Sequence, residues 1–372
     1  MQNEIFQNIN KIIDRDSKST TYKFALLRGV IDIIQENSPY LKRFSNDKVT
    51  MPTGLLIEKW LLYYYPILES ARYIPQSYGT TNLAFGSQLK RIIEAYKSRG
   101  GFSAFYNDLK TKGIQGELKT DFLALLRTLQ KTITTQPMKY IGGSFNDRHW
   151  SIFVYEPGKA KRQDKDIDIQ YIVDNYGSFS IPYEYYEVFN FLGNFIGGQD
   201  SILFKWAEFS VNASKNNLSM ENVLNEVLKS PIDSRDVAES KQIYKSILAH
   251  EGSVRCVWTG EPLKKYDIDH VIPFSIWKNN DLWNLLPSNA KINNHKRNKI
   301  PSPERIVQNK DLILHYWELI NIKQPERFHK EMKVTLLGNN TSESWQTAGI
   351  EQLISSCRYL ISDRGYEEWK VY

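Results

Sequence analysis

The chain has 372 residues, a length that fits two or three domains. Its composition, 41% hydrophobic, 13% aromatic and 24% charged, is that of a globular protein and excludes a disordered, collagen-like or coiled-coil chain. The 48 lysines and arginines exceed the 42 acidic residues by a net charge of +6, too little to indicate a nucleic-acid partner by itself. The position of that excess along the chain therefore decides its meaning.

The two cysteines, Cys256 and Cys357, lie far apart in the sequence and exclude a disulfide framework. A zinc site built on cysteine needs more cysteines, or histidines at short spacing, and neither lies near these two residues. Residues 1–14 carry acids and amides where a signal peptide has its apolar core, which predicts a cytoplasmic protein. The longest apolar stretch, residues 55–68, is interrupted by charges and a proline and is too short to cross a bilayer.

Apolar residues recur at helical spacing through residues 1–135. The stretch 55–68 is apolar nearly all round, so we expect it at the centre of a core. We interpret its three consecutive tyrosines, and most of the 22 in the chain, as packing residues rather than platforms for stacked bases. The predicted helices of this region are residues 22–34, 55–68, 89–96 and 118–129.

The pattern changes in the next part of the chain. Residues 139–155 and 167–181 alternate Tyr, Phe, Ile and Val with polar residues, which predicts strands. Helical spacing returns at residues 202–211 and 237–248. Between these helices, residues 212–235 are rich in Ser, Asn and Lys, and we expect a domain boundary there.

The most informative stretch is residues 255–301. Residues 266–272 alternate apolar and acidic side chains and predict a strand that a proline ends. Residues 282–286 form a second short apolar run. A Pro-Ser pair then offers a cap for a helix predicted over residues 289–299, which another proline stops. The predicted order is strand, loop, strand, helix.

Polar side chains gather in this stretch. Asp269 and His270 are adjacent on the first predicted strand, so they point to opposite faces unless the strand end re-aims one. Asn293, Lys296 and Arg297 stand at i, i+3 and i+4 of the predicted helix and share one face. A carboxylate and an amide oxygen beside an imidazole suit a hard divalent cation and a general base.

These residues resemble the HNH nuclease domain, also called the ββα-metal finger. The name records a His at the end of strand one, an Asn in strand two and a His or Asn in the helix. The matching positions are His270 in DIDHVIP, Asn284 in DLWNLLP and Asn293 in SNAKINNHKRNK. Because the third position is Asn, the chain is similar to the H-N-N branch, which includes the HNH domain of CRISPR effector nucleases.

The resemblance implies a role for each residue. His270 is the general base that activates the attacking water, and Asp269 and Asn293 bind one Mg²⁺ or Mn²⁺ ion. Asn284 orients the His270 loop or ring through its amide. This division fits phosphodiester hydrolysis, which needs a deprotonated water and a cation that stabilises the charge developing on the leaving oxygen.

Some assignments in this stretch have alternatives. Asp267 could be a second metal ligand, although a solvated strand residue is the simpler interpretation. His295 could replace Asn293 as the ligand, but helix geometry turns it to another face. Asn284 could be a strand-pairing residue without a catalytic role. Cys256 stands without the paired cysteines of zinc-binding HNH domains, so we expect it in the core.

The positive charge is concentrated around the same stretch. Residues 251–310 hold ten lysines and arginines against six acidic residues, which is four of the six excess charges. Such a patch supplies affinity for phosphates without sequence information. The cations that we expect to contact the nucleic acid are Lys291, Lys296, Arg297 and Lys299.

The sequence therefore predicts a mostly helical α+β protein. We expect an N-terminal recognition or regulatory domain at residues 1–235, with a strand-rich segment near 137–182. An HNH domain at 236–304 and a helical extension at 305–372 follow. The ββα unit is too small to fold by itself, so we expect the extension to pack on it or on the first domain.

The function predicted from these features is a metal-dependent endonuclease that cuts double-stranded DNA, in bacterial restriction or phage defence. A nuclease that cuts both strands usually needs two such sites, which predicts a homodimer or partner subunits. Two other functions stay open from the sequence. One is a nucleic-acid-binding or scaffold protein with a degenerate nuclease domain, and the other is a nuclease directed at RNA.

Overall fold

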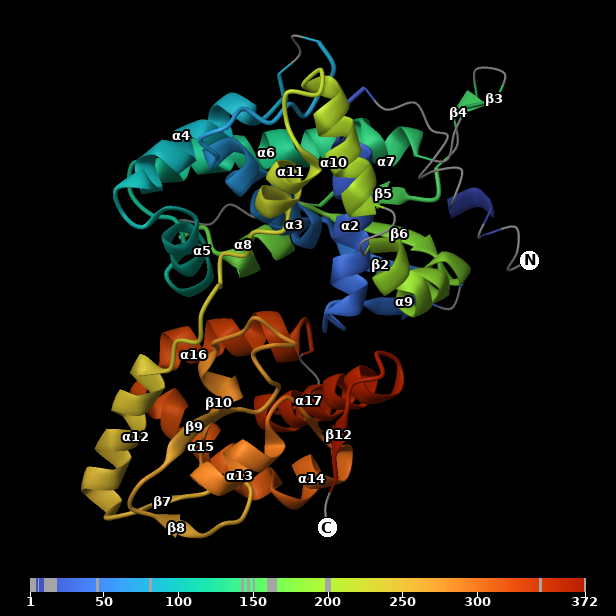
Figure 1. Cartoon of the computed structure of the whole chain (residues 1–372). Helices are drawn as coiled ribbons and strands as arrows, with labels where there is room; N and C mark the ends of the chain where they lie inside the picture. Colours follow the sequence, from blue (N-terminus) through green and yellow to red (C-terminus); the bar gives the residue numbers. More distant parts are fainter. Residues whose placement is uncertain are drawn as a thin grey trace. The chain divides into compact units, whose positions relative to one another are not determined.

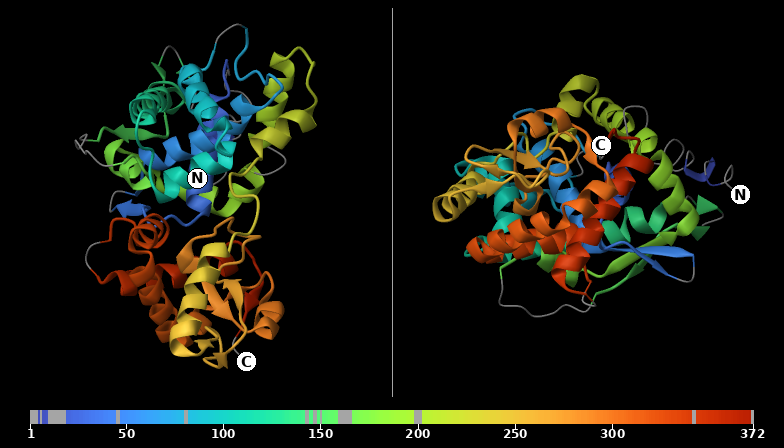
Figure 2. Two further views of the ribbon diagram at one scale, coloured as in Figure 1. Left: turned by 90° about the vertical axis from the view of Figure 1, so that its left-hand side faces the viewer. Right: turned by 90° about the horizontal axis from the view of Figure 1, so that it is seen from below.

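The computed structural model describes residue 5 and residues 7–9, 19–44, 47–79, 82–141, 144–145, 148–149, 151–158, 166–197, 202–340 and 343–370. The chain divides into two compact units, Met1–Pro231 and Ile232–Tyr372 (Figure 1). Both units contain many helices and only short strands (Figure 2), which confirms the mostly helical α+β class. None of the helices described is long and apolar enough to span a membrane.

Helix α3, Thr53–Glu69, is the central helix of the first unit, as its pattern predicted. It buries nearly all of its residues, including the three consecutive tyrosines, and packs against α2 and α8. Gly54 permits this approach, because a Cβ at that position would lie 2.2 Å from the carbonyl oxygen of Ile172 in α8. The helices of the unit are α2 Tyr22–Gln35, α3, α4 Gly86–Lys97, α5 Gly101–Thr111, α6 Leu118–Thr135, α7 Pro137–Tyr140, α8 Ile169–Asn175, α9 Tyr183–Gly197, α10 Ile202–Ala213 and α11 Met220–Val227.

The first unit also holds a four-stranded antiparallel sheet in the order β1-β2-β6-β5. Strand β2 pairs along its whole length with β6, where Met51 stands opposite Phe179 and both are fully buried. A separate two-stranded hairpin joins β3 and β4. The strands are β1 Lys42–Phe44, β2 Lys48–Pro52, β3 Ser144–Phe145, β4 Arg148–His149, β5 Val154–Glu156 and β6 Ser178–Pro182.

The strand predictions for this unit were wrong in part. Within 167–181, the residues from Ile169 to Asn175 form helix α8, because the Asp168 carboxylate accepts a hydrogen bond from the Tyr171 amide at 2.9 Å and caps the helix. The buried apolar residues of this helix, Ile169, Ile172 and Val173, stand at helical spacing. Alternation with polar residues in the same stretch is what had predicted a strand. Within 139–155, helix α7 takes the first residues and short strands follow; residues 142, 143, 146, 147 and 150 lie outside the described part.

In the second unit, the predicted strand-loop-strand-helix segment lies between one helix that precedes it in the chain and several helices that follow it. The division from the first unit follows Pro231, inside the stretch 212–235. Its helices are α12 Ala238–Glu251, α13 Ala290–Lys296, α14 Pro303–Gln308, α15 Lys310–Lys323, α16 Pro325–Met332 and α17 Trp345–Ser362, with a 3₁₀ turn η2 Leu282–Asn284 and a π turn η3 Lys333–Leu337. Its strands are β7 Val254–Arg255, β8 Pro262–Leu263, β9 Asp267–His270, β10 Leu285–Ser288, β11 Ile300–Pro301 and β12 Glu368–Trp369.

The helices after residue 305 share one hydrophobic core with the ββα segment. The Trp317 indole of α15 donates to the carbonyl of Trp283 at 2.9 Å, and the Tyr244 hydroxyl of α12 donates to the carbonyl of Leu285 at 2.9 Å. Strand β12 at the end of the chain pairs in parallel with β11, directly after α13. The ββα segment is therefore held by contacts from both flanking parts of the unit.

We expect an isolated fragment of residues 250–302 to be unfolded, because it lacks α12, α15 and β12. A fragment of about 50 residues without disulfides or a metal buries too little apolar surface to be stable. A fragment of residues 232–372 should instead unfold in one cooperative transition. Thermal unfolding followed by circular dichroism compares the two, and a cooperative transition in the shorter fragment would contradict the prediction.

Candidate active site

Asp269 and His270 end strand β9, which pairs antiparallel with β10. Both residues are buried, with exposed fractions of 4% and 5%. Their side chains have different partners: the Asp269 carboxylate accepts from Trp258 and Lys296, whereas the His270 ring contacts Asn280. This agrees with the alternation of side chains along a strand.

Asn284 fixes the backbone that follows His270. It lies in the turn η2, directly before β10, rather than in the second strand. Its Oδ1 accepts from the Ile272 amide at 2.8 Å, and its Nδ2 donates to the Ile272 carbonyl at 3.1 Å. Its own carbonyl accepts from the Val271 amide at 2.8 Å. Asn284 is fully buried, so these bonds are shielded from water and hold the two residues after His270 in one conformation.

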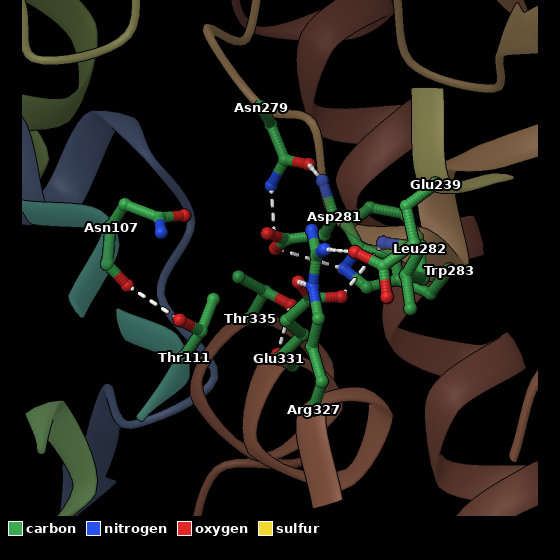
Figure 3. A network of polar contacts seen from close by, with 10 residues as sticks. All are labelled: Asn107, Thr111, Glu239, Asn279, Asp281, Leu282, Trp283, Arg327, Glu331 and Thr335. Atoms are coloured by element: carbon green, nitrogen blue, oxygen red, sulfur yellow. Dashed lines mark hydrogen bonds and ion pairs between the residues drawn. The ribbon is translucent and has the colours of Figure 1, made fainter. Parts of the chain in front are cut away.

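A network of polar contacts supports the turn that carries Asn284 (Figure 3). The buried Asp281 carboxylate accepts from Asn279 Nδ2 at 2.8 Å and from the Trp283 indole at 3.2 Å. The Asp281 amide donates back to Asn279 Oδ1 at 2.7 Å. A residue before the turn and a residue within it are thereby tied to one carboxylate.

Helix α16 holds the same turn from another side (Figure 3). Glu331 is 1% exposed, and its Oε2 accepts from the Leu282 amide at 2.7 Å. Its other oxygen accepts from Arg327 Nε at 2.7 Å, and Arg327 also pairs with Glu239 of α12. These carboxylates raise the pKa of Arg327 against the opposing effect of burial, so it stays charged. The position of Asn284 therefore depends on a helix beyond the ββα segment.

No sequence pattern singled out Asn280, which contacts the His270 ring. Asn280 Oδ1 lies 3.1 Å from His270 Nε2, and Asn280 Nδ2 donates to the Ser234 carbonyl at 3.0 Å. Because the amide nitrogen faces the carbonyl, the amide oxygen faces the imidazole, and the ring nitrogen that carries the proton is Nε2. In the neutral ring, Nδ1 is then free to accept a proton.

The environment of His270 keeps its ring neutral. Burial, the largest influence, lowers the pKa of His270 from its ordinary value of 6.5. The hydrogen bond to Asn280 and the charge of Asp269 act in the opposite direction, while the cations Arg235 and Lys296 lower the pKa further. The imidazole is therefore unprotonated at pH 7, the form that a general base requires.

Lys296 does not occupy the position predicted for it. It is 0% exposed, and its Nζ lies 2.9 Å from Asp269 Oδ1 and also donates to the His270 carbonyl. A fully buried ammonium that is paired with a carboxylate has no access to a nucleic-acid phosphate. The prediction that Lys296 contacts phosphate is therefore corrected: it is an internal partner of Asp269.

Helix α13 is shorter than predicted and ends at Lys296, because Arg297 adopts φ 51° and leaves the helix. Its cap is Asn289, whose side chain accepts from the Lys291 amide at 2.8 Å. Lys291 and Arg297 are exposed, as a phosphate contact requires. Lys299 is half-buried and its Nζ lies 2.7 Å from Glu367, so a phosphate would have to compete with that carboxylate.

Asp267 and His295, the alternative metal ligands that the sequence left open, are both exposed. His295 is exposed, and its Nδ1 accepts from the Trp369 indole of β12 at 3.2 Å. Asp267 is exposed at the start of β9, at the opposite end of the strand from His270. Asn293 is half-buried and precedes Lys296 by nearly one helical turn, so it shares the helix face that reaches Asp269.

The residues near Asp269 fit a hydrated divalent ion. Among the described residues, no group of three or more His, Cys, Asp or Glu could enclose a metal. One carboxylate and one amide oxygen suit Mg²⁺, which is usually held by one or two carboxylates and keeps several waters. Each oxygen of Asp269 already accepts one hydrogen bond and retains a second lone pair. The assignment of Asp269 and Asn293 as ligands of such an ion stays a prediction from the sequence.

Cys256 lies in the core, as predicted. It is fully buried and carries a free thiol, and its sulfur accepts from the Asn289 amide at 3.3 Å. This bond ties the start of α13 to the loop after β7. The cysteine therefore helps to place the helix that bears Asn293 and Lys296.

Known protein families match the chain in two places. Residues 2–227 match a family described as a domain of unknown function, DUF8808, and residues 256–302 match the HNH endonuclease family. The second match covers β9, β10 and α13 and confirms the resemblance found in the sequence. HNH nucleases act on nucleic acids and generally use a divalent metal. No curated protein and no solved structure matches the chain.

Proposed function

Because the chain belongs to the DUF8808 family over residues 2–227 and carries an HNH endonuclease unit at residues 256–302, we propose that it is a metal-dependent nuclease that hydrolyses DNA phosphodiester bonds. The observation that supports this most strongly is the arrangement of His270. Its ring is buried and neutral, one ring nitrogen is hydrogen-bonded to Asn280, and Asn284 fixes the backbone that follows His270. Such a ring is positioned to accept a proton at a single atom.

In this proposal His270 Nδ1 takes the proton from the attacking water, while Nε2 keeps its hydrogen bond to Asn280. The amide of Asn280 also stabilises the imidazolium that forms, because its oxygen accepts from the charged ring. Asn284 keeps the ring in place through Ile272. A divalent ion held by Asp269 and Asn293 would supply charge stabilisation for the leaving oxygen.

The acid limb of the pH-rate profile is expected to lie below pH 6.5. His270 must be neutral to act as a base, and burial lowers its pKa, so activity should persist as the pH falls through 6.5 and disappear only below it. In Asn280→Ala the hydrogen bond that raises this pKa is removed, and the limb should move further toward acid. The measurement is kcat/KM on DNA between pH 5 and 8; an acid limb above 6.5 would contradict the prediction.

The test of the proposed activity is digestion of supercoiled plasmid DNA and of RNA, side by side, by the purified full chain. Cleavage of DNA with Mg²⁺ or Mn²⁺, and none with a chelator, is expected. Preferential cleavage of RNA would move the proposal to that substrate. Binding to DNA in gel shifts without cleavage under any metal would support the alternative, a binding protein with a degenerate nuclease unit.

We assign substrate selection or gating to the first unit, because the ββα segment is short and can read little sequence by itself. This architecture fits a nuclease of restriction or phage defence, acting as a dimer or with partner subunits. Discrete plasmid fragments are expected from a sequence-specific enzyme, and a continuous smear from a non-specific effector. The sizes of the cleavage products on a defined plasmid distinguish the two roles.

A further inference from the structure

Two exposed cations outside α13 lie in segments that converge on His270. Arg235 precedes α12, and Lys278 lies in the loop between β9 and η2. No sequence pattern singled out either of them, because they lie far apart in the chain. Asn280 contacts both His270 and the residue before Arg235, and Phe274 contacts both His270 and Lys278.

Asn280 brings the segment of Arg235 to the imidazole. One end of its amide contacts His270 Nε2 at 3.1 Å, and the other donates to the carbonyl of Ser234 at 3.0 Å. Arg235 is the next residue and is exposed. The backbone that carries Arg235 is therefore fixed beside the amide that contacts His270.

Lys278 reaches the same ring through Phe274. Its Nζ lies 4.9 Å from the centre of the Phe274 ring, over its face. The Phe274 ring in turn meets the His270 ring edge to face, with centroids 5.6 Å apart. Phe274 is buried, whereas Lys278 is exposed, so the ammonium lies at the surface over Phe274, the ring that contacts the imidazole.

Neither cation is neutralised by a carboxylate. Within the part of the chain that the structure describes, no acidic oxygen lies within 4.0 Å of the charged groups of Arg235 or Lys278. Lys296 and Lys299, by contrast, are paired with Asp269 and Glu367. An exposed cation without a carboxylate partner can take up a phosphate without first breaking an ion pair.

We propose that Arg235 and Lys278 bind the DNA backbone phosphates that flank the scissile one and so position the scissile phosphate at His270. The proposal rests on the proposed function, since it assigns these residues to the same active site. An arginine can hold a phosphate through two hydrogen bonds, and a lysine acts as a point charge. Together with Lys291 and Arg297, they replace Lys296 and Lys299 as the residues that bind the DNA backbone.

The test measures DNA binding apart from cleavage. Full-length protein with His270→Ala, in a chelator, is titrated with a short labelled DNA duplex over a range of KCl concentrations. Adding Arg235→Ala and Lys278→Ala should weaken binding by about tenfold for each residue, as expected when a charged hydrogen bond is removed. The slope of log K against log salt should fall by about 0.9 for each phosphate that the protein no longer neutralises.

The matched control is Lys264→Ala with Lys265→Ala in the same background. These lysines are exposed and precede β9, at the end of the strand opposite His270, so the variant removes the same charge elsewhere. The control should keep the affinity and the salt slope. In cleavage-competent protein, Arg235→Lys with Lys278→Arg should keep KM near the original value, whereas the double alanine variant raises KM.

The outcomes separate this proposal from the proposed function. If both double alanine variants lower affinity and slope equally, or if neither does, Arg235 and Lys278 have no special role and the proposal is overturned. The same holds if the protein binds no DNA. If binding is weakened selectively but the unsubstituted chain cleaves nothing, the assignment of the two cations to phosphate stands and the nuclease activity fails.

Discussion

Replacing His270 with alanine is expected to lower the rate of metal-dependent DNA cleavage by about 10³-fold, within the range that a positioned acid or base contributes. The substitution removes the one proton acceptor that the fold orients through Asn280 and Asn284. Asp269→Ala should abolish cleavage as well, because it removes the one carboxylate of the proposed ion site. Initial rates of plasmid nicking with saturating Mg²⁺ measure both effects.

His295→Ala is the matched control for this prediction. His295 is a histidine of the same ββα segment, but it is exposed and bonded to Trp369. Its substitution should leave the cleavage rate within a few-fold of the original. Circular dichroism establishes that each variant retains its fold. Undiminished cleavage by both Asp269→Ala and His270→Ala would reject the assigned active site, and loss of cleavage in His295→Ala alone would favour that residue as the ligand.

Replacing Lys296 with methionine is expected to lower the free energy of unfolding by about 3–5 kcal/mol, the cost of removing one partner of a buried ion pair. Methionine fills much of the same space, but Asp269 would be left with an uncompensated charge at 4% exposure. The carbonyl of His270 would also lose a donor. Urea unfolding of the full chain, or of residues 232–372, measures the change.

Two comparisons make this result specific. Lys291→Met removes an exposed lysine from the same helix and should change the free energy of unfolding by less than about 0.5 kcal/mol. The double variant Asp269→Asn with Lys296→Met should recover part of the stability, because no unpaired charge remains. If Lys296→Met kept full stability and only weakened DNA binding, the lysine would be a surface phosphate contact, as its sequence position suggested.

Much of the nuclease segment could be predicted because its signals are local. The alternation before Pro273, the apolar run at 282–286 and the capped helix after it lie close together in the chain, and they led to His270 and Asn284 as candidates. The longer helices of the first unit were also predictable, since burial on one face leaves apolar residues at helical spacing and burial on all faces leaves a long apolar run. Helix α8 was not, because its seven residues fit a strand pattern almost as well.

The sequence by itself determined the order of the elements in the ββα segment, the family of the nuclease unit and the candidates for catalysis, because these follow from short-range patterns of residue type. Only the tertiary structure decided what each polar group contacts. Lys296 is buried against Asp269, 27 positions away, and Asn280 links His270 to Ser234, which precedes Asn280 by 46 positions. Charge and spacing carry no information on such distant partners, since burial and hydrogen bonding arise only when the whole unit packs.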